Sequence, residues 1–293
     1  MGQALVNGLA EGSIYAVLAI GLVFIFKITE VANFAQGEIA MVAAFVAFTV
    51  LERYGVPLPV GLLAGVVAGG LAGYAMERIA IRPLLGTGRM GMGALGPAVV
   101  TLGLYFVLHG TATVVWGPDV HPFPSVFGGD MLTFGGLLVS RQHLAIMVAS
   151  LLTAVALSAF LRYTDLGLAM RCIPQNRYAA RLIGLDVPRL YGLTWTIGAA
   201  VSAMGGILLA PIVFLNTNMM TDMTNNAFAV AVLGGLGSLV GAFVGALILG
   251  IVKNVGVLYL PTEMKESMAF VIVLAVLLVR PEGLFGKPQP EKI

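Results

Sequence analysis

The sequence predicts an all-α membrane protein that crosses the bilayer several times. Hydrophobic residues make up 59% of the 293 residues, whereas charged residues make up only 10%. One soluble domain of this length cannot bury so much apolar surface, so the solvent of this chain is lipid. The apolar runs are too long and too continuous for the alternating pattern of barrel strands. Helices are then the remaining structure in which all backbone N–H and C=O groups can form hydrogen bonds inside the membrane.

We expect about eight membrane segments in one transmembrane domain that covers residues 1–293, because a bilayer core about 30 Å thick takes roughly 20 helical residues to cross. The predicted segments, in chain order, are 4–28, 35–51, 57–76, 93–116, 143–161, 190–213, 226–258 and 267–280. The first segment lacks the basic start and the small-residue cleavage site of a secretory signal. We therefore expect it to remain as a membrane helix.

The first segment carries an acidic residue. Asn7 and Glu11 are four residues apart and share one face of a helix. A carboxylate near the middle of the bilayer costs about 2.5–3.5 kcal/mol, so we expect Glu11 to face protein, water or the outer interface rather than lipid. Two interpretations remain: an interfacial residue at the helix start, or a residue that lines a cavity.

The second segment begins with the polar stretch NFAQGEIAM, residues 33–41. We predict that Asn33 caps a helix by accepting a backbone N–H, that Gln36 returns the bond, and that Glu38 lies near the positive end of the helix dipole. Such a start inside a transporter also leaves N–H groups that could meet a solute carboxylate. Whether the helix start can meet a solute depends on how deep it lies in the membrane. It lies either toward the cytoplasmic side or at an unwound point within the membrane.

The distribution of basic residues in the short loops predicts the orientation. Three groups should face the cytoplasm: Arg78, Arg82 and Arg89; then Arg162, Arg171, Arg177, Arg181 and Arg189; and finally Arg280, Lys287 and Lys292. Residues 117–142 and 256–266 contain few basic residues and should lie outside. The N-terminus then faces outward, and the tail, residues 281–293, lies in the cytoplasm.

The seventh segment, 226–258, is longer than one span needs and is interrupted by LGGLGSLVGAFVG, residues 233–245. Glycine this dense permits either one tightly packed helix or a broken, re-entrant pair. The orientation favours the pair, since the segment must begin and end on the outer side for the last helix to return to the cytoplasm. The residues that we predict to line a translocation path are Glu11, Asn33, Gln36, Glu38, Gly235, Gly237 and Ser238.

Residues 162–189 form the longest polar interruption, which we name the coupling segment. A short helix is predicted near 176–183, where Asn176 can cap the start and Gly184 can end it. Asp186 can then open the next membrane helix. The segment is either a solvated basic loop or a docking helix that inserts into a groove of a cytoplasmic partner.

The sequence does not carry the usual catalytic patterns. It has no G-x-x-x-x-G-K-[ST] phosphate loop, because GLFGKP is too short and ends in proline, so any ATP hydrolysis occurs in another chain. His109, His121 and His143 lack the spacing of a metal or acid–base site, and we expect no catalytic residue and no bound metal. The single cysteine, Cys172, cannot form an internal disulfide. A net charge of +2 without a lysine-rich tail does not indicate nucleic-acid binding.

Several motifs resemble one family of membrane transporters. AARLIG, residues 179–184, resembles the Ala-Ala-x-x-x-Gly core of the loop by which permeases of ABC importers engage their ATPases, although Tyr178 stands where many carry Glu. ANFAQGE, residues 32–38, is similar to the INFAHGE signature of LivH-type permease subunits of branched-chain amino acid importers. Further similar stretches cover nearly the whole chain in order: ERIAIRPL (77–84), RYTDLGLAMRC (162–172), VLGGLGSLVGAFVGALILG (232–250) and RPEGLFGKP (280–288).

This resemblance implies a multi-pass permease subunit of the inner membrane that works by alternating access. It also implies a second, related permease, two cytoplasmic ATPases and an extracytoplasmic solute-binding protein as partners. ATP and Mg would bind to the ATPases, with no cofactor in this chain. The residues that the resemblance assigns to ATPase coupling are Gly167, Arg171, Asn176, Arg177, Ala179, Ala180, Arg181 and Gly184.

The expected solute is a branched-chain or related amino acid, and a permease for urea or short amides is the alternative. A self-contained secondary transporter would need a relay of buried acids, for which only Glu11 and Glu38 are candidates. A membrane enzyme would need a reactive constellation, which the sequence does not offer.

Overall fold

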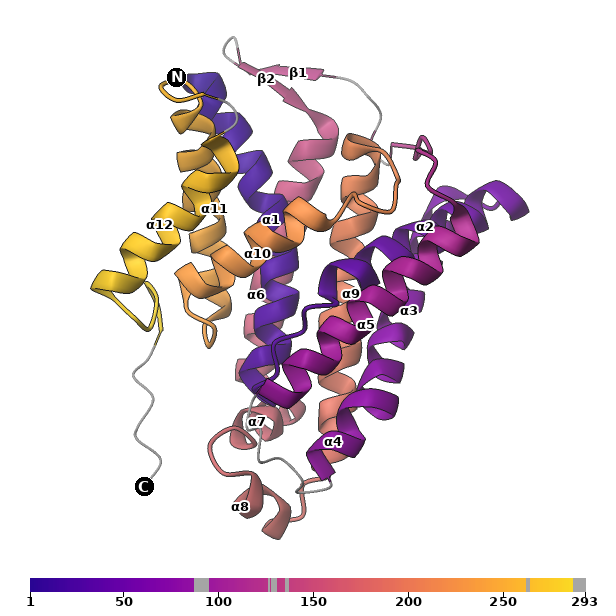
Figure 1. Cartoon of the computed structure of the whole chain (residues 1–293), viewed down its shortest axis with the longest axis vertical. Helices are drawn as coiled ribbons and strands as arrows, with labels where there is room; N and C mark the ends of the chain where they lie inside the picture. Colours follow the sequence, from indigo (N-terminus) through magenta and orange to yellow (C-terminus); the bar gives the residue numbers. More distant parts are fainter. Residues whose placement is uncertain (87–94, 126, 128–130, 135–136, 262–263, 287–293) are drawn as a thin grey trace.

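The chain folds into a bundle of long helices with short helices and a small hairpin at its two ends (Figure 1). This computed structural model describes all residues except 87–94, 126, 128–130, 135–136, 262–263 and 287–293. The first half contains α1 (Gly2–Thr29), α2 (Gln36–Tyr54), α3 (Leu58–Met76), a π-helical turn (Glu77–Ile81), α4 (Arg82–Gly86) and α5 (Leu95–Trp116). The second half contains β1 (Met131–Phe134), β2 (Leu137–Ser140), α6 (Arg141–Tyr163), α7 (Asp165–Cys172), α8 (Arg177–Leu182), α9 (Val187–Val213), α10 (Thr221–Gly234), α11 (Leu239–Gly256) and α12 (Lys265–Val279).

The predicted all-α membrane class is confirmed, whereas the predicted number of about eight spans is not. Within the described residues, six helical stretches are long and apolar enough to cross a membrane: Gly2–Thr29, Leu58–Leu84, Gly96–Trp116, Arg141–Tyr163, Val187–Val213 and Leu239–Gly256. The predicted segments at 35–51 and 267–280 do form α2 and α12 but do not meet that criterion. α12 has 15 residues and covers about 22 Å, which is less than a bilayer core.

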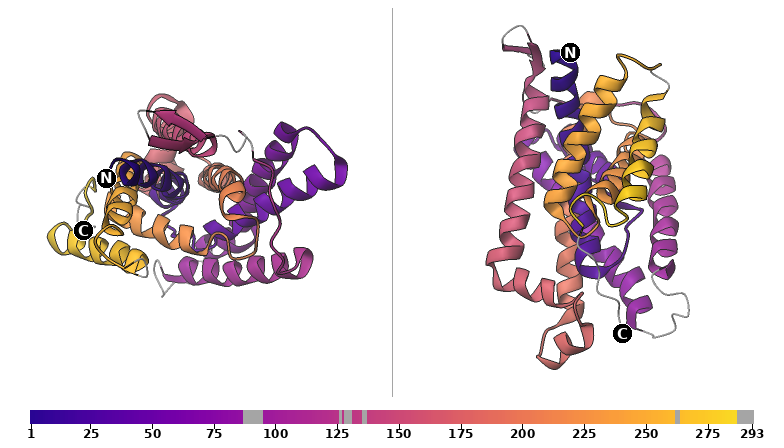
Figure 2. Two further views of the ribbon diagram at one scale, coloured as in Figure 1. Left: turned by 90° about the horizontal axis from the view of Figure 1, so that it is seen from above. Right: turned by 90° about the vertical axis from the view of Figure 1, so that its left-hand side faces the viewer.

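α1 is the central helix of the bundle, and α6, α9, α10 and α11 surround it (Figure 2). Its middle is closed to solvent, with Tyr15, Ile20 and Phe24 all 0% exposed. Two glycines let it lie directly on α11. A Cβ on Gly8 would lie 2.7 Å from the Cα of Ile251, so these two backbones pack without intervening side chains.

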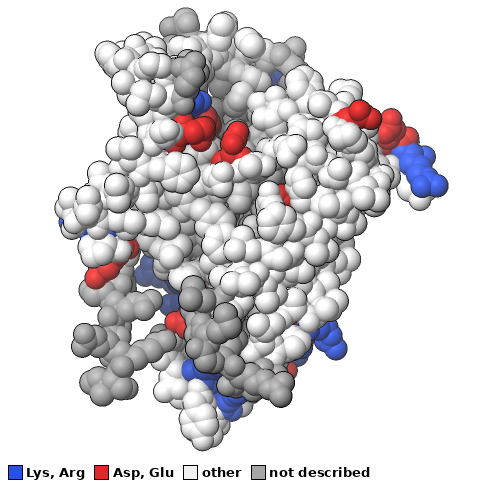
Figure 3. Space-filling model, viewed as in Figure 1, with Lys and Arg blue, Asp and Glu red and all other residues white. Residues whose placement is uncertain are grey.

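The outer surface of the bundle is apolar along α3, α5 and α6. Leu63, Phe106 and Leu152 are each more than half exposed, which suits helices that face lipid. Lys and Arg side chains gather at the end of the molecule where α4 and α8 lie, while the N-terminus lies at the opposite end (Figures 1 and 3). This separation agrees with the predicted grouping of basic residues, of which Arg89, Lys287 and Lys292 lie outside the described residues.

The seventh predicted segment is a broken pair, as the orientation argument favours. α10 has 14 residues, too few to span the membrane, and it turns at residues 235–238 into α11. Gly235 has φ +93°, a conformation that only glycine adopts readily. The turn lies about midway along the bundle, and α11 ends beside the N-terminal end of α1, so the pair is re-entrant (Figure 1).

The sequence prediction missed the short helix α4 and two further features. β1 and β2 form an antiparallel hairpin in which Met131 pairs with Ser140 and Leu132 with Val139. The hairpin is attached to the start of α1, since Gln3 Nε2 donates to the carbonyl oxygen of Leu138 at 2.8 Å. Its signal in the sequence is a Gly-Gly pair between two apolar stretches. The other missed element is α7, a helix of 8 residues at the beginning of the coupling segment.

Candidate functional site

The start of α2 lies beside the middle of α9. Gln36 Nε2 donates to the carbonyl oxygen of Gly198 at 3.0 Å and to Ser202 Oγ at 2.6 Å. Gly198 is eleven residues after Val187, where α9 begins, and Ser202 is eleven residues before Val213, where it ends. Because α9 is one of the candidate spans, the start of α2 lies beside the mid-length of a helix that is long enough to cross a membrane. This position matches one of the two depths that the sequence allowed, the unwound point within the membrane.

The polar groups at this start are buried and hydrogen-bonded, three of them to one another and the other two to neighbouring groups. We name Asn33, Gln36, Glu38, Thr101 and Ser202 the central polar site; each is at most 2% exposed. Asn33 Nδ2 donates to Gln36 Oε1 at 2.6 Å, and Asn33 Oδ1 accepts from the backbone N–H of Ala35 at 3.1 Å. Thr101 of α5 donates to the carbonyl oxygen of Ala32 at 3.1 Å. The site therefore joins the link between α1 and α2 to two other helices.

The predicted capping box is wrong in its details. The residue that precedes the first turn of α2 is Ala35, and no side chain caps that helix. Asn33 accepts a backbone N–H two residues on, as in an Asx turn, rather than from inside the helix. Gln36 does not return a bond to the backbone N–H of Asn33, because its Oε1 accepts from the side chain of Asn33 instead. Its amide nitrogen donates to acceptors on α9.

Glu38 lies in the first turn of α2, as predicted, and contacts a histidine that the sequence did not associate with it. Glu38 Oε2 lies 3.2 Å from His109 Nδ1 on α5. The Glu38 side chain is 2% exposed, and the His109 side chain is 28% exposed. The His109 ring also stacks on Tyr105, with ring centroids 5.9 Å apart. A carboxylate this far inside a membrane helix needs such a partner.

The re-entrant helix α10 packs against the same start of α2. The rings of Phe34 and Phe228 stack with centroids 4.8 Å apart and an interplanar angle of 20°. A Cβ on Gly37 would overlap Thr224 Oγ1, so Gly37 allows α10 to approach the first turn of α2. The central polar site is thus bounded by α1, α2, α5, α9 and α10.

The structure places the three residues predicted at the re-entrant turn in other contacts. A Cβ on Gly235 would lie 2.7 Å from the backbone nitrogen of Gly286, because the tail packs on the turn. The carbonyl oxygen of Gly237 accepts from Lys27 Nζ at 2.8 Å. Ser238 caps α11 by accepting from the backbone N–H of Gly241 at 3.0 Å. These three residues therefore contact the tail and the helix ends around the turn.

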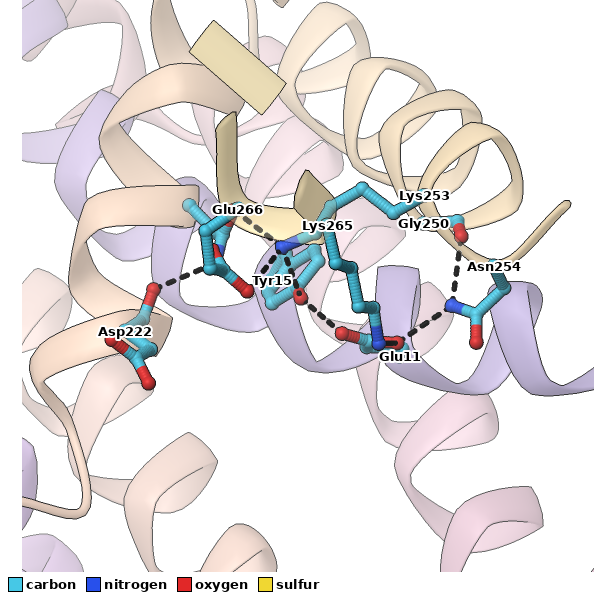
Figure 4. A network of polar contacts seen from close by, with 9 residues as sticks. Glu11, Tyr15, Asp222, Gly250, Lys253, Asn254, Lys265 and Glu266 are labelled. Atoms are coloured by element: carbon cyan, nitrogen blue, oxygen red, sulfur yellow. Dashed lines mark hydrogen bonds and ion pairs between the residues drawn. The ribbon is translucent and has the colours of Figure 1, made fainter. Parts of the chain in front are cut away.

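Glu11 belongs to a second polar cluster, which we name the mixed-charge network. Glu11 Oε2 accepts from Lys265 Nζ at 2.7 Å and from Asn254 Nδ2 at 2.6 Å, and its other oxygen accepts from the Tyr15 hydroxyl (Figure 4). Its side chain is 19% exposed and faces protein, as expected of a membrane carboxylate. The complete network comprises Glu11, Tyr15, Asn226, Lys253, Asn254, Lys265 and Glu266.

The predicted helix of the coupling segment is confirmed as α8. Asn176 Oδ1 accepts from the backbone N–H of Ala179 at 2.9 Å, and Gly184 follows the helix with φ +86°. Asp186 caps α9 by accepting from the backbone N–H of Arg189 at 3.1 Å, also as predicted. Arg177 fixes α8 to α9, since its guanidinium donates to the Tyr191 hydroxyl at 2.5 Å.

The two alanines of the coupling motif have different environments. Ala180 is 2% exposed and packs against the core, whereas Ala179 is exposed. Around Ala179, the end of α8 presents an apolar surface with one cation. The exposed residues are Tyr178, Arg181, Leu182, Ile183 and Gly184. This surface has the composition expected of an interface rather than of a solvated loop.

Gly167 and Arg171 lie on α7. A Cβ on Gly167 would lie 2.6 Å from the Cα of Leu161, so this glycine lets α7 fold back closely on the end of α6. Arg171 is partly buried, and its Nε has no hydrogen-bond partner in the described part of the chain. Nearby, Arg82 binds both oxygens of the buried Glu77, at 3.1 and 2.6 Å, and the carbonyl oxygen of Pro188 at 3.0 Å. The motif ERIAIRPL thereby anchors the beginning of α9.

Sequence reasoning missed Lys253, Lys265, Glu266 and His109 as members of these clusters. For Lys253 a signal existed, because a lysine inside the apolar segment 226–258 requires a partner. Within the described residues, no group of three His, Cys, Asp or Glu side chains could hold a metal ion.

The comparisons with known proteins agree on one family. The family described as "Branched-chain amino acid transport system / permease component" matches residues 4–277. The high-affinity branched-chain amino acid transport system permease protein LivH of Salmonella typhimurium is 32% identical over 305 residues, which cover 99% of this chain and 97% of the relative. The permease protein BraD of Pseudomonas aeruginosa is 32% identical over 304 residues, with the same coverage. A probable LivH of Methanocaldococcus jannaschii is 26% identical and covers 94% of this chain and 89% of the relative.

Proposed function

The chain belongs to the family of branched-chain amino acid transport permease components, and we propose that it is the membrane subunit of an ATP-driven importer. The complete importer contains a second, related permease, two cytoplasmic ATPases that bind ATP and Mg, and an extracytoplasmic solute-binding protein. The solute is a branched-chain or related amino acid. The chain itself lies in the inner membrane with the coupling segment and the C-terminus in the cytoplasm.

The observation that carries this proposal is the depth of the central polar site. An amino acid is charged at both ends, so a path through lipid must offer it polar groups at mid-depth. Gln36 and Glu38 stand beside the middle of the spanning helix α9, at the first turn of a helix that begins inside the membrane. The positive end of the α2 dipole favours a carboxylate, and Glu38 favours an ammonium group.

The coupling segment supports the transmission of movement from the ATPases. α8 lies at the basic end of the bundle with Tyr178, Leu182 and Ile183 each more than 70% exposed. α8 is bonded through Arg177 to α9, and the middle of α9 contacts Gln36. A displacement of α8 can therefore reach the central polar site along one rigid helix. Alternating access follows if ATP-driven closure of the ATPases moves the coupling segment.

Reconstitution tests the proposal directly. Proteoliposomes would contain this chain, the second permease and both ATPases, and uptake of radiolabelled leucine would be measured with ATP inside and solute-binding protein outside. We expect uptake only when all components and ATP are present. Uptake at the same rate by this chain alone would contradict the proposal, because it would make the chain a self-contained transporter.

The solute is tested with the cognate solute-binding protein. Calorimetry with leucine, isoleucine, valine, urea and acetamide would report which of them it binds. We expect the three branched-chain amino acids to bind more tightly than the two amides. If only urea or acetamide bound tightly, the chain would still be proposed as an importer subunit, but its solute would be an amide rather than an amino acid.

A further inference from the structure

Lys253 is an ammonium group that is fully enclosed by protein. It lies near the end of α11, and its side chain is 0% exposed. Its Nζ lies 2.8 Å from Glu266 Oε1, 3.0 Å from Asn226 Oδ1 and 3.3 Å from the Tyr15 hydroxyl oxygen (Figure 4). An ammonium group has three donors, and these three acceptors come from three different helices, α12, α10 and α1.

The bond to Asn226 matters because of where Asn226 lies on α10. Asn226 is buried, and its Nδ2 donates to Glu266 Oε2 at 3.0 Å. Thr224 and Phe228 are two residues away on either side, so they share the opposite face of the helix. Those two residues are the ones that contact Gly37 and Phe34 at the start of α2. α10 is therefore held by the mixed-charge network on one face, and with the other it touches the start of α2 beside the central polar site.

A purely structural tie would not need charges at this place. The ammonium group of Lys253 is buried, whereas its partner Glu266 is 49% exposed. The best-attested use of buried ionic groups is to fix one arrangement of the parts that they join. Ionisable groups inside a membrane likewise occur mainly where they serve a function. The network is balanced, since two lysines face two glutamates.

We propose that Lys253 is a positioning residue for transport: through Asn226 it sets the place where α10 meets the start of α2, and thereby the shape of the central polar site. This inference rests on the proposed function of that site. The inference goes beyond the proposed function because it assigns a role to residues of the mixed-charge network, which do not touch the central polar site themselves.

Cross-linking tests the proposal in the complete importer, in a Cys172→Ser background. Phe34→Cys with Phe228→Cys reports the contact between α10 and α2, and the rate of linking by a short bifunctional thiol reagent is the measurement. Phe45→Cys with Trp116→Cys is the reference pair, because these rings stack 5.1 Å apart between α2 and α5. Lys253→Met removes the ammonium group while it keeps a long unbranched side chain. Lys265→Met removes the same charge from the network but leaves Glu11 bonded to Tyr15 and Asn254.

We expect Lys253→Met to slow linking of the 34–228 pair about tenfold, the effect of losing a charged hydrogen-bond donor, and to leave the 45–116 pair unchanged. Lys265→Met should change neither rate by more than about twofold. Equal linking of the 34–228 pair in Lys253→Met and its parent would overturn the proposal, and so would a parallel fall in both pairs. If Lys253→Met does not assemble, Asn226→Leu cuts the same link from the α10 side, and unchanged linking there would overturn it equally.

Leucine uptake by the Lys253→Met importer separates this proposal from the previous one. Slower linking together with slower uptake supports both. Slower linking with unchanged uptake keeps Lys253 as the residue that places α10 and overturns the role of the central polar site in transport.

Discussion

The amide nitrogen of Gln36 donates to the hydroxyl of Ser202 across 2.6 Å, and this bond joins the first turn of α2 to the middle of α9. Gln36 is 2% exposed and Ser202 is 0% exposed, so water cannot replace either partner. The half of the bundle that contains α2 is thereby tied to the helix that leads to the coupling segment.

Replacing Gln36 by methionine should reduce both stability and uptake. Methionine keeps the length of the side chain but removes its bonds to Asn33, Gly198 and Ser202, which leaves buried polar groups unpaired. The expected loss of unfolding free energy is about 1–3 kcal/mol. Ser202→Ala is the matched control, because it removes one of these bonds and leaves Gln36 Nε2 with Gly198. Thermal unfolding of the complex and leucine uptake are the measurements, and a smaller effect of Gln36→Met than of Ser202→Ala would contradict this account.

The contact between Glu38 and His109 should appear as energetic coupling. Glu38→Gln and His109→Gln each change one partner of a contact in which Glu38 Oε2 and His109 Nδ1 lie 3.2 Å apart. In a double-mutant cycle on thermal stability, we expect an interaction free energy of about 0.5–3 kcal/mol. Effects that simply add would show that the two side chains do not stabilise each other. Uptake should fall in the Glu38→Gln variant if this carboxylate meets the ammonium group of the solute.

Glycine should be required where α1 contacts α11 but not on the open surface of α5, so alanine substitutions at the two places should have different effects on stability. A Cβ on Gly12 would lie 2.6 Å from the carbonyl oxygen of Ala246, so Gly12→Ala forces the helices apart and should cost about 1–3 kcal/mol. On α5, a Cβ on Gly110 would meet nothing within 4 Å. Gly110→Ala should therefore be neutral or stabilise by up to about 1 kcal/mol, because alanine favours the helix. Unfolding temperatures compare the two, and equal shifts would count against the close helix contact.

Local signals in the sequence were sufficient to predict most of the elements. The lengths of the apolar runs located the long helices to within a few residues, because each run reports burial in lipid along its own helix. The ends of α8 were predicted for the same reason, since Asn176 and Gly184 act on the backbone next to them. Predicting the broken pair required a further step, which was to count the membrane crossings between the groups of basic residues. This count also uses only the order of the segments along the chain.

Partners that are distant in the sequence could not be predicted. Lys253 meets Tyr15 238 residues away, and Glu38 meets His109 71 residues away. Gln36 has partners of both kinds: its Oε1 accepts from the side chain of Asn33 three residues away, whereas its amide nitrogen donates to acceptors 162 and 166 residues away on α9. The local sequence indicated a capping box and gave no sign of these distant acceptors. The predicted number of about eight spans is not confirmed, since neither α2 nor α12 is among the candidate spans. α12, with 15 residues, is too short to cross a bilayer although its composition is apolar.

The two alanines of the coupling motif give the sharpest test of ATPase docking. Ala179 is exposed on α8, so Ala179→Trp should leave the unfolding temperature of this chain nearly unchanged and reduce both copurification of the ATPases and ATP-driven uptake. Ala180 is 2% exposed and packs inside the chain, so Ala180→Leu overfills the core and should destabilise the coupling segment by about 1–3 kcal/mol. Comparing the two variants separates the loss of an ATPase interface from a distortion of the coupling segment itself. A substitution at Ala180 alone cannot separate these two effects. Full copurification and uptake with Ala179→Trp would show that the exposed end of α8 is not the surface that binds the ATPases.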